Sequence, residues 1–323
     1  MLVLGLQGSP RKKGNSKFLL ERFMKTAENM GARTHIVDVT RKNIIPCKEY
    51  VVCEKKGYCP IEDDVRDEIY PLLRQAEVVV LATPIFFYNM TAQLKAVVDR
   101  CQTFWARKYL LKLKDPGANM RRGFLLSVAA TRGKNLFEGL NLTTQYFFDA
   151  IGAKFEGSLT YRGIEGPKDM AGHPTVQDDV AKAVQGILQP FGNRKKVLFA
   201  CRENACRSQM ASAFAQSLAG DKLDVLNAGS QPVEQIQPDM VAVMHEKGID
   251  MGFRTPQKLD DVISQDTPEI IVTMGCAEQC PAVAGARKLD WDLPDPAGKP
   301  IEFMRDVRDE IEKRVQNLIS EIT

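Results

Sequence analysis

Short apolar runs alternate with longer helical segments along this chain, and this alternation constrains the fold more than any other feature. Strand-like runs are expected at residues 1–9, 33–39, 77–83, 123–129 and 153–161, and again at 195–200, 222–229, 269–275 and 287–291. Helical segments are expected at residues 16–30, 91–105, 136–151 and 176–189, from 208 onward, and at 238–247 and 302–322. Apolar strands joined by helices predict an α/β fold with doubly wound parallel sheets. Ligands of such sheets bind beyond the carboxyl ends of the strands.

A segment with proline, glycine and basic residues, QPFGNRKK at residues 189–196, separates the two series of runs. A chain of 323 residues is long enough for two domains of ordinary size. We therefore place a first domain at residues 1–190 and a second at residues 195–323.

Charge and hydropathy exclude several classes of protein. No apolar run is long enough to cross a bilayer, and MLVLGLQGSP lacks the charged start and cleavage site of a signal peptide. We therefore expect a cytoplasmic protein without a membrane partner. The net charge is only +3 and no Lys/Arg run is interleaved with aromatics, which argues against a nucleic-acid partner. In that compartment the 8 cysteines are expected to be catalytic, metal-binding or buried, and Cys101 to be a small core residue.

The segment LFACRENACRSQM, residues 198–210, places Cys201 at the end of an apolar strand, with a helix beginning near Ser208. Backbone N–H groups of the connecting loop, together with the helix N-terminus, form a site for a tetrahedral oxyanion. The same positive field favours the thiolate form of a cysteine at the base of the loop. Arg207 can direct two donors at two oxyanion oxygens, and Ser208 can hydrogen-bond the thiolate.

This motif resembles the signature of the low-molecular-weight tyrosine phosphatase superfamily, in which cysteine, five residues, arginine and then serine or threonine follow one another. The resemblance covers residues 195–323 and implies a fold like that of the low-molecular-weight phosphatases. It implies that Cys201 is the nucleophile and that Asn204 braces the loop. It also implies that Asp295, in the segment DLPDPAGKP, is the general acid. Asp292 is a second candidate for that acid.

A cysteine pair separates this domain from the phosphatases themselves. Cys276 and Cys280 follow a strand in VTMGCAEQCP, and Ala297 stands after Asp295-Pro296, where the phosphatases usually have an aromatic residue. Both features resemble the thioredoxin-type arsenate reductases of the same superfamily. The resemblance implies that Cys201 attacks arsenate or a phosphate-like oxyanion, that Cys276 then attacks Cys201, and that Cys280 attacks Cys276. Thioredoxin is a candidate reductant of the resulting Cys276–Cys280 disulfide. The alternative interpretation of this cysteine pair is half of a zinc site.

Three positions depart from the pattern of these reductases. Arg202 and Glu203 replace small residues of the loop, and Glu203 brings a negative charge close to an anion site. Ser212 stands where many of the reductases carry a glutamate associated with a potassium site, so we assign no metal. We assign Cys206 no step in the reaction.

A second phosphate-binding pattern, QGSPRKKGNS, lies between the first strand and the first helix. With the later segment ATPIFFYNMTAQLKAVVDR, it resembles the NADPH-dependent FMN reductase and iron–sulfur flavoprotein group, over residues 1–190. The resemblance implies a flavodoxin-like fold, bound FMN, NADPH or NADH as electron donor, and a homodimer formed through this domain. The implied FMN-binding residues are Ser9, Arg11, Asn15, Ser16, Thr83, Pro84, Ile85, Phe86, Phe87, Tyr88, Asn89, Thr131, Arg132 and Gly133.

Iron–sulfur flavoproteins carry a compact run of four cysteines. Here Cys47, Cys53 and Cys59 are present, but Tyr50 fills the remaining place. Three thiolates could hold an iron–sulfur cluster only with an outside ligand or an open iron.

These features favour an arsenate reductase fused to an NAD(P)H-dependent FMN reductase that supplies electrons. Two alternatives are a tyrosine phosphatase whose flavin domain controls the redox state of Cys201, and a non-enzymatic flavin or thiol sensor. The pair Cys276 and Cys280 favours the reductase.

Overall fold

The computed structural model describes residues 1–275 and 283–322. The chain divides into two compact units, which are described separately. Unit 1 contains residues 1–112 and 120–190, and unit 2 contains residues 113–119 together with the chain from Phe191 onward. The segment 113–119, which sequence reasoning places in the first domain, thus belongs to the second unit by its contacts.

Unit 1 is built on a five-stranded parallel sheet with the order β2-β1-β3-β4-β5. Its strands are β1 (Leu2–Gln7), β2 (Arg33–Asp38), β3 (Val78–Pro84), β4 (Arg122–Ala129) and β5 (Lys154–Arg162). This is the flavodoxin-like order, in which the direction of winding changes between the first and third strands. β1, β3 and β4 are almost continuously buried, which explains their uninterrupted apolar sequences.

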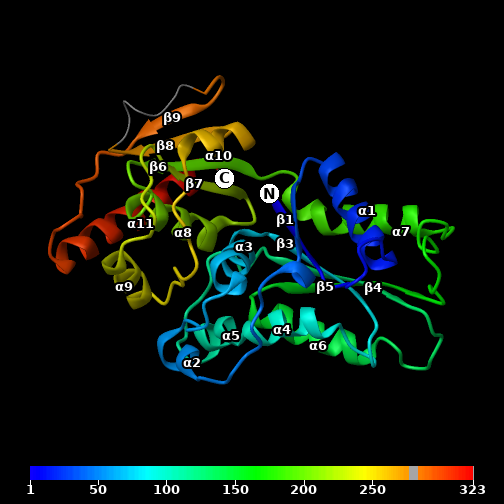
Figure 1. Cartoon of the computed structure of the whole chain (residues 1–323). Helices are drawn as coiled ribbons and strands as arrows, with labels where there is room; N and C mark the ends of the chain where they lie inside the picture. Colours follow the sequence, from blue (N-terminus) through cyan, green and yellow to red (C-terminus); the bar gives the residue numbers. More distant parts are fainter. Residues whose placement is uncertain (276–282, 323) are drawn as a thin grey trace. The chain divides into compact units, whose positions relative to one another are not determined.

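Helices cover both faces of this sheet (Figure 1). α1 (Asn15–Asn29) and α7 (Val176–Leu188) pack together on one face, and α4 (Ala92–Arg100), α5 (Gln102–Tyr109) and α6 (Glu138–Ala150) lie on the other. In α1 the buried residues Leu19, Leu20 and Phe23 recur at helical spacing and form one apolar stripe. The doubly wound architecture expected from the alternating runs is therefore confirmed.

The helix expected at residues 91–105 is in fact two helices that meet at Cys101. The hydroxyl of Tyr70 donates to the carbonyl of Arg100 at 2.6 Å. That carbonyl is thereby engaged outside the helix. The N–H of Phe104 donates instead to the carbonyl of Cys101, three residues before it rather than four. Three other helices were not expected from the sequence, namely α2 (Val52–Lys56), α3 (Tyr70–Gln75) and α10 (Leu259–Gln265).

Unit 2 has a four-stranded parallel sheet with the order β7-β6-β8-β9. Its strands are β6 (Lys195–Cys201), β7 (Leu223–Gly229), β8 (Ile270–Met274) and β9 (Arg287–Asp290), and its other helices are α8 (Arg207–Ala219), α9 (Pro238–Glu246) and α11 (Ile301–Ile322). Winding changes direction between β6 and β8, so a ligand is expected beyond their carboxyl ends.

The alternation of β6 assigns Cys201 to one face of this sheet. Val197, Phe199 and Cys201 belong to the core formed with α8, α9 and α11, whereas Leu198 and Ala200 pack in a separate cluster with α10. Cys201 therefore ends the strand on the face that α8 covers.

Candidate functional site

Cys201 is the last residue of β6 and lies beside the ends of both neighbouring strands. Its register partners are Gly229 at the end of β7 and Met274 at the end of β8. The side chain is only 3% exposed. The thiol thus sits at the point where the winding of the sheet reverses, which is the usual ligand position in this fold class.

The loop after Cys201 turns its carbonyl groups outward. Carbonyls of Cys201, Arg202, Glu203 and Ala205 accept from the N–H groups of Ser230, Gln231, Val233 and Gln237, at 2.8–3.2 Å. Because the carbonyls point away, N–H groups of the loop face the thiol, and the N–H of Asn204 donates to Cys201 Sγ at 3.3 Å. Gly229 permits this close packing, since a Cβ there would lie 2.7 Å from the carbonyl oxygen of Arg202.

Asn204 holds the loop in shape from inside. Its backbone has a positive φ of 52°, and its side chain is fully buried. Asn204 Nδ2 donates to Ser208 Oγ at 2.7 Å and to Asn227 Oδ1 at 3.0 Å, while Asn204 Oδ1 accepts from the N–H of Gln257 at 2.8 Å. Ser208 Oγ lies 3.0 Å from Cys201 Sγ. Since Ser208 already accepts from Asn204, its own proton is available for the sulfur.

Arg207 begins α8 and points its guanidinium across the site. Nη1 donates to the carbonyl of Leu293 at 3.0 Å, and Nη2 lies 3.4 Å from Asp295 Oδ2. The guanidinium is mostly buried, whereas the carboxylate of Asp295 is exposed. α8 has no acidic residue in its first turn, which favours an anion at its N-terminus. The structure therefore brings together Cys201, Asn204, Arg207, Ser208 and Asp295.

Cys206 belongs to the hydrophobic core rather than to this group. It is 6% exposed, and its Sγ lies 3.3 Å from the sulfur of Met304. Burial raises the pKa of the Cys206 thiol, and the nearby Cys201 adds to that rise. A buried neutral thiol is a poor nucleophile, which agrees with its having no assigned step.

The remaining predicted positions have the following places. Cys276 and Cys280 lie outside the described residues. Ser212 donates its hydroxyl to the carbonyl of Gln209 at 3.0 Å inside α8, and exposed Arg202 donates to Gln231 Oε1 at 3.0 Å. Nothing in the structure explains the negative charge of Glu203.

Two supporting residues were missed by sequence reasoning. Asn227 and Gln257 bond the side chain of Asn204 from β7 and from the segment before α10. Asn227 could have been noticed, because it is a polar residue in the apolar strand VLNAG. Gln257 lies in an irregular segment and gives no sequence signal.

Unit 1 has a cavity of about 210 Å³ at the carboxyl ends of its strands. Its lining comes from the segments after β1, β3, β4 and β5: Ser9, Pro10, Arg11, Gly14, Asn15, Ser16, Pro84, Ile85, Phe86, Val128, Ala130, Ile164 and Glu165. Seven of the predicted FMN-binding residues are among them. Ile164 and Glu165 were not predicted, although the end of β5 is an expected ligand position.

The residues at the end of this cavity fit the phosphate group of FMN. Ser16 is buried, and its Oγ has no hydrogen-bond partner in the structure. α1 begins beside it with Gly14 as an N-cap that makes no side-chain bond, and it has no acidic residue in the first turn. An unpartnered hydroxyl beside uncapped N–H groups is the arrangement that binds a phosphate oxygen.

Two predicted FMN contacts are engaged elsewhere. The Asn15 side chain donates to the carbonyl of Gly166 at 2.9 Å and accepts from the N–H of Met170 at 3.1 Å, so it fastens the segment after β5. Thr83 is fully buried, and its hydroxyl donates to the carbonyl of Pro84 at 2.9 Å. Asn15 thus lines the cavity with its polar groups already bonded, and Thr83 lies outside the lining.

The aromatic segment after β3 forms a tight turn. Phe86 and Asn89 pair across it, and the central residues Phe87 and Tyr88 both have positive φ, at 46° and 62°. The side chain of Phe87 is fully exposed, and Tyr88 lies beside Gly133. The cavity lining does not include six of the predicted FMN-binding residues, namely Phe87, Tyr88, Asn89, Thr131, Arg132 and Gly133.

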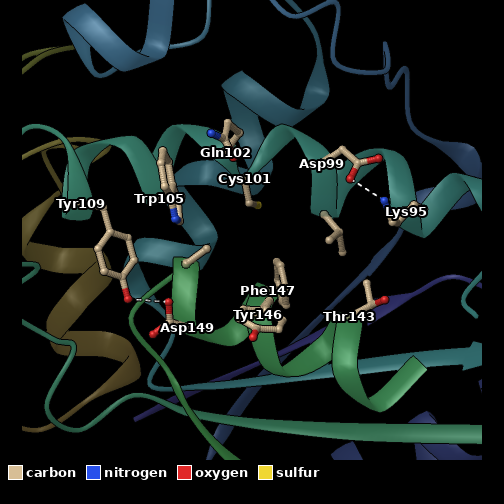
Figure 2. A pocket seen from close by; sticks show the side chains of 12 residues that line it. Lys95, Asp99, Cys101, Gln102, Trp105, Tyr109, Thr143, Tyr146, Phe147 and Asp149 are labelled. Atoms are coloured by element: carbon tan, nitrogen blue, oxygen red, sulfur yellow. Dashed lines mark hydrogen bonds and ion pairs between the residues drawn. The ribbon is translucent and has the colours of Figure 1, made fainter. Parts of the chain in front are cut away.

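A second cavity, of about 490 Å³, lies between α4–α5 and α6 (Figure 2). Lys95 and Asp99 pair at 2.6 Å at one end of it, and the hydroxyl of Tyr109 donates to Asp149 at 2.8 Å at the other. Cys101 faces this cavity but is 1% exposed, and burial raises its pKa. Its interpretation as a core residue is thus confirmed.

Comparisons with known proteins divide the chain in the same way. Residues 1–135 match the family model of NADPH-dependent FMN reductase, and residues 196–323 match that of low molecular weight phosphotyrosine protein phosphatase. An iron–sulfur flavoprotein of Methanosarcina thermophila is 33% identical over 61% of this chain and 100% of the relative. A glutaredoxin arsenate reductase of Synechocystis sp. is 36% identical over 40% of this chain and 99% of the relative.

The chain belongs to both families. Its first part is a member of the FMN reductase and iron–sulfur flavoprotein family, and its second part is a member of the arsenate reductase family within the low-molecular-weight phosphatase group. Both are oxidoreductase families, as the motifs indicated. Among solved structures, an arsenate reductase in the oxidised state is 34% identical over 40% of this chain and 99% of that chain, with a TM-score of 0.37.

The described part of the chain, residues 1–275 and 283–322, holds neither a ready-made metal site nor a membrane-spanning helix. Within these residues, no three His, Cys, Asp or Glu side chains converge as a set that could hold a metal ion. No helix of this part of the chain is long and apolar enough to cross a membrane.

Proposed function

We propose that unit 2 reduces arsenate to arsenite through the thiols of Cys201, Cys276 and Cys280, and that unit 1 is a flavin domain that supplies the electrons. One observation supports this most strongly. The sulfur of Cys201 accepts from the N–H of Asn204 and lies beside Ser208 Oγ, in the loop that leads to Arg207, and Cys201 ends the strand next to β8. The pair of further cysteines follows β8 directly in the sequence.

The first step is displacement at arsenic. Cys201 Sγ forms a bond to arsenic while one arsenic–oxygen bond breaks, and the departing oxygen takes a proton from Asp295 and leaves as water. The N–H groups of the loop and the guanidinium of Arg207 stabilise the negative charge on the remaining oxygens. The ion pair between Arg207 and Asp295 would open as the oxyanion takes the guanidinium.

The next two steps transfer electrons. Cys276 attacks Cys201 Sγ, a disulfide forms between them, and the electron pair of the sulfur–arsenic bond stays on arsenic, which leaves as arsenite. Cys280 then attacks Cys276, which frees Cys201 as a thiolate and leaves a Cys276–Cys280 disulfide. A two-electron reductant must restore this pair of thiols.

Unit 1 would hold FMN at the 210 Å³ cavity, with Ser16, Arg11 and the N-terminus of α1 on its phosphate. When bound, FMN accepts a hydride from NADPH or NADH and supplies the electrons that the disulfide needs, either directly or through a carrier such as thioredoxin. A Ser16→Ala variant should bind FMN at least about tenfold more weakly, because a hydrogen bond to a charged phosphate contributes about 1.5–3 kcal/mol. A homodimer formed through this unit stays a prediction, which sedimentation would test.

Arsenite production with NADPH and no added thioredoxin tests the proposal. We expect turnover that Cys201→Ser and Cys276→Ser each abolish and that Cys280→Ser alone limits to one arsenite per chain. Turnover that appears only with thioredoxin would rule out direct transfer between the units. Release of phosphate from phosphotyrosine, unchanged in the variant lacking Cys276 and Cys280, would instead favour the phosphatase.

A further inference from the structure

Three thiols of unit 1 face one cavity that the proposed function does not use. This cavity, of about 490 Å³, is formed by the loop of residues 46–60, which we call the cysteine loop. Cys47, Cys53 and Cys59 all line it, together with Tyr50. Cys47 is exposed and the other two are half-buried, so a small solute can reach all three.

A buried ion pair holds the two ends of the cysteine loop together. Arg100 and Asp63 are paired at 2.5 Å, and both side chains are completely buried. Arg100 donates to the carbonyl of Ile45, just before the loop, at 2.8 Å, and to that of Ile61, just after it, at 3.4 Å. Asp63 in turn accepts from the N–H of Ile45 at 2.9 Å. The base of the loop is thus closed, although the loop itself is mostly exposed.

Within the loop, local conformation fixes the short segment that carries Cys53. Val51 and Gly57 have positive φ, at 55° and 70°, and bracket the short helix α2, which carries Cys53. Arg107 fixes the end of α2 by donating to the carbonyl of Gly57 at 2.8 Å.

The cysteine loop does not fit the iron–sulfur cluster that the family name implies. A four-iron cluster is held by four thiolates, and here the phenol of Tyr50 occupies one of the four places. In the described part of the chain, the three thiols also do not converge as a ready-made metal site. Three neighbouring thiols on a loop closed at its base fit a ligand that forms its bonds to sulfur one after another.

We propose that the cysteine loop binds trivalent arsenic through Cys47, Cys53 and Cys59. Arsenic(III) is soft and three-coordinate, and it prefers thiolate sulfur to oxygen. Arsenous acid, As(OH)₃, exchanges its three hydroxyl groups for three thiols and releases three waters, with no change of oxidation state. Each thiol proton leaves with one hydroxyl group, so neutral thiols suffice. That arsenite is the natural ligand rests on the proposed function of unit 2.

Arsenite titration of the full chain tests this site. The relay is first removed by Cys201→Ser, Cys276→Ser and Cys280→Ser, so that added arsenite cannot bind there. We expect one arsenic per chain, the loss of three titratable thiols, and three sulfur neighbours of arsenic by X-ray absorption. Cys53→Ser in this background should leave at most two sulfur neighbours and weaken binding at least tenfold, whereas Cys101→Ala should change neither. Binding that Cys53→Ser leaves unaltered would overturn the proposal.

Anaerobic reconstitution with iron and sulfide tests the competing occupant. We expect no stable cluster in the native sequence, and a gain of the cluster's visible absorbance in Tyr50→Cys. Uptake of four irons per chain by the native sequence would contradict the assignment. Because arsenite is added directly to a chain without the relay, the arsenite titration can be interpreted even if unit 2 does not reduce arsenate.

Discussion

Ser208→Ala isolates a single hydrogen bond to the reactive sulfur. Ser208 Oγ lies 3.0 Å from Cys201 Sγ and accepts from Asn204 Nδ2 at 2.7 Å, which leaves its proton for the sulfur. A hydrogen bond to a charged group contributes about 1.5–3 kcal/mol. Since about 1.4 kcal/mol corresponds to a factor of ten, loss of this bond should slow reactions of the Cys201 sulfur ~10- to 100-fold. The N–H of Asn204 still donates to the sulfur, so we expect the lower end of this range.

Alkylation of Cys201 by iodoacetamide, followed by mass spectrometry of its peptide, measures this directly. The rate for Ser208→Ala should be about tenfold lower than for the native chain. Ser208→Thr retains a hydroxyl and should remain close to native. Ser212→Ala is the matched control, because its hydroxyl is also buried in α8 but donates to the carbonyl of Gln209. Equal slowing by both alanine variants, or no slowing by either, would refute the reasoning.

Three further predictions concern the site and the loop. Arg207→Lys loses the forked guanidinium, so kcat for arsenate should fall ~10²- to 10³-fold while oxidation of NADPH by free flavin is unchanged; a fall of less than threefold would count against the role. Cys206→Ala should leave kcat within about threefold, because burial raises the pKa of the Cys206 thiol and keeps it neutral, and steady-state kinetics would show otherwise if it joined the relay. Arg100→Met leaves the carboxylate of Asp63 buried without its charged partner and should lower the free energy of unfolding of unit 1 by about 3–5 kcal/mol in urea titrations, whereas a loss below about 1 kcal/mol would contradict this.

The fold could be predicted because its strands have strong local signals. The run VLFAC is apolar throughout and predicts a buried strand that ends at Cys201, as β6 does, whereas the face that Cys201 occupies comes from the structure. The short helices α2, α3 and α10 have too few residues to show a helical period. The break at Cys101 depends on Tyr70, which lies thirty residues away and donates to the carbonyl of Arg100. Such a contact leaves no local pattern.

The candidate site was partly predictable, because part of it lies within one short stretch of sequence. The spacing of Cys201, Arg207 and Ser208 is dictated by one loop, and the structure brings these residues together. Asn15 shows the limit of the approach, because its side chain holds the segment at Gly166 rather than facing a phosphate. Sequence spacing shows which residues are near a site, whereas tertiary hydrogen bonds decide which polar groups remain free within it.

Trapping the first disulfide tests the central claim most directly. A Cys280→Ser chain, fully reduced and then given arsenate, can complete only the first two steps, and its disulfides can be mapped by mass spectrometry of unreduced peptides. We predict a disulfide between Cys201 and Cys276 and one arsenite released per chain. Arsenite released without that disulfide, or the absence of both, would contradict the relay.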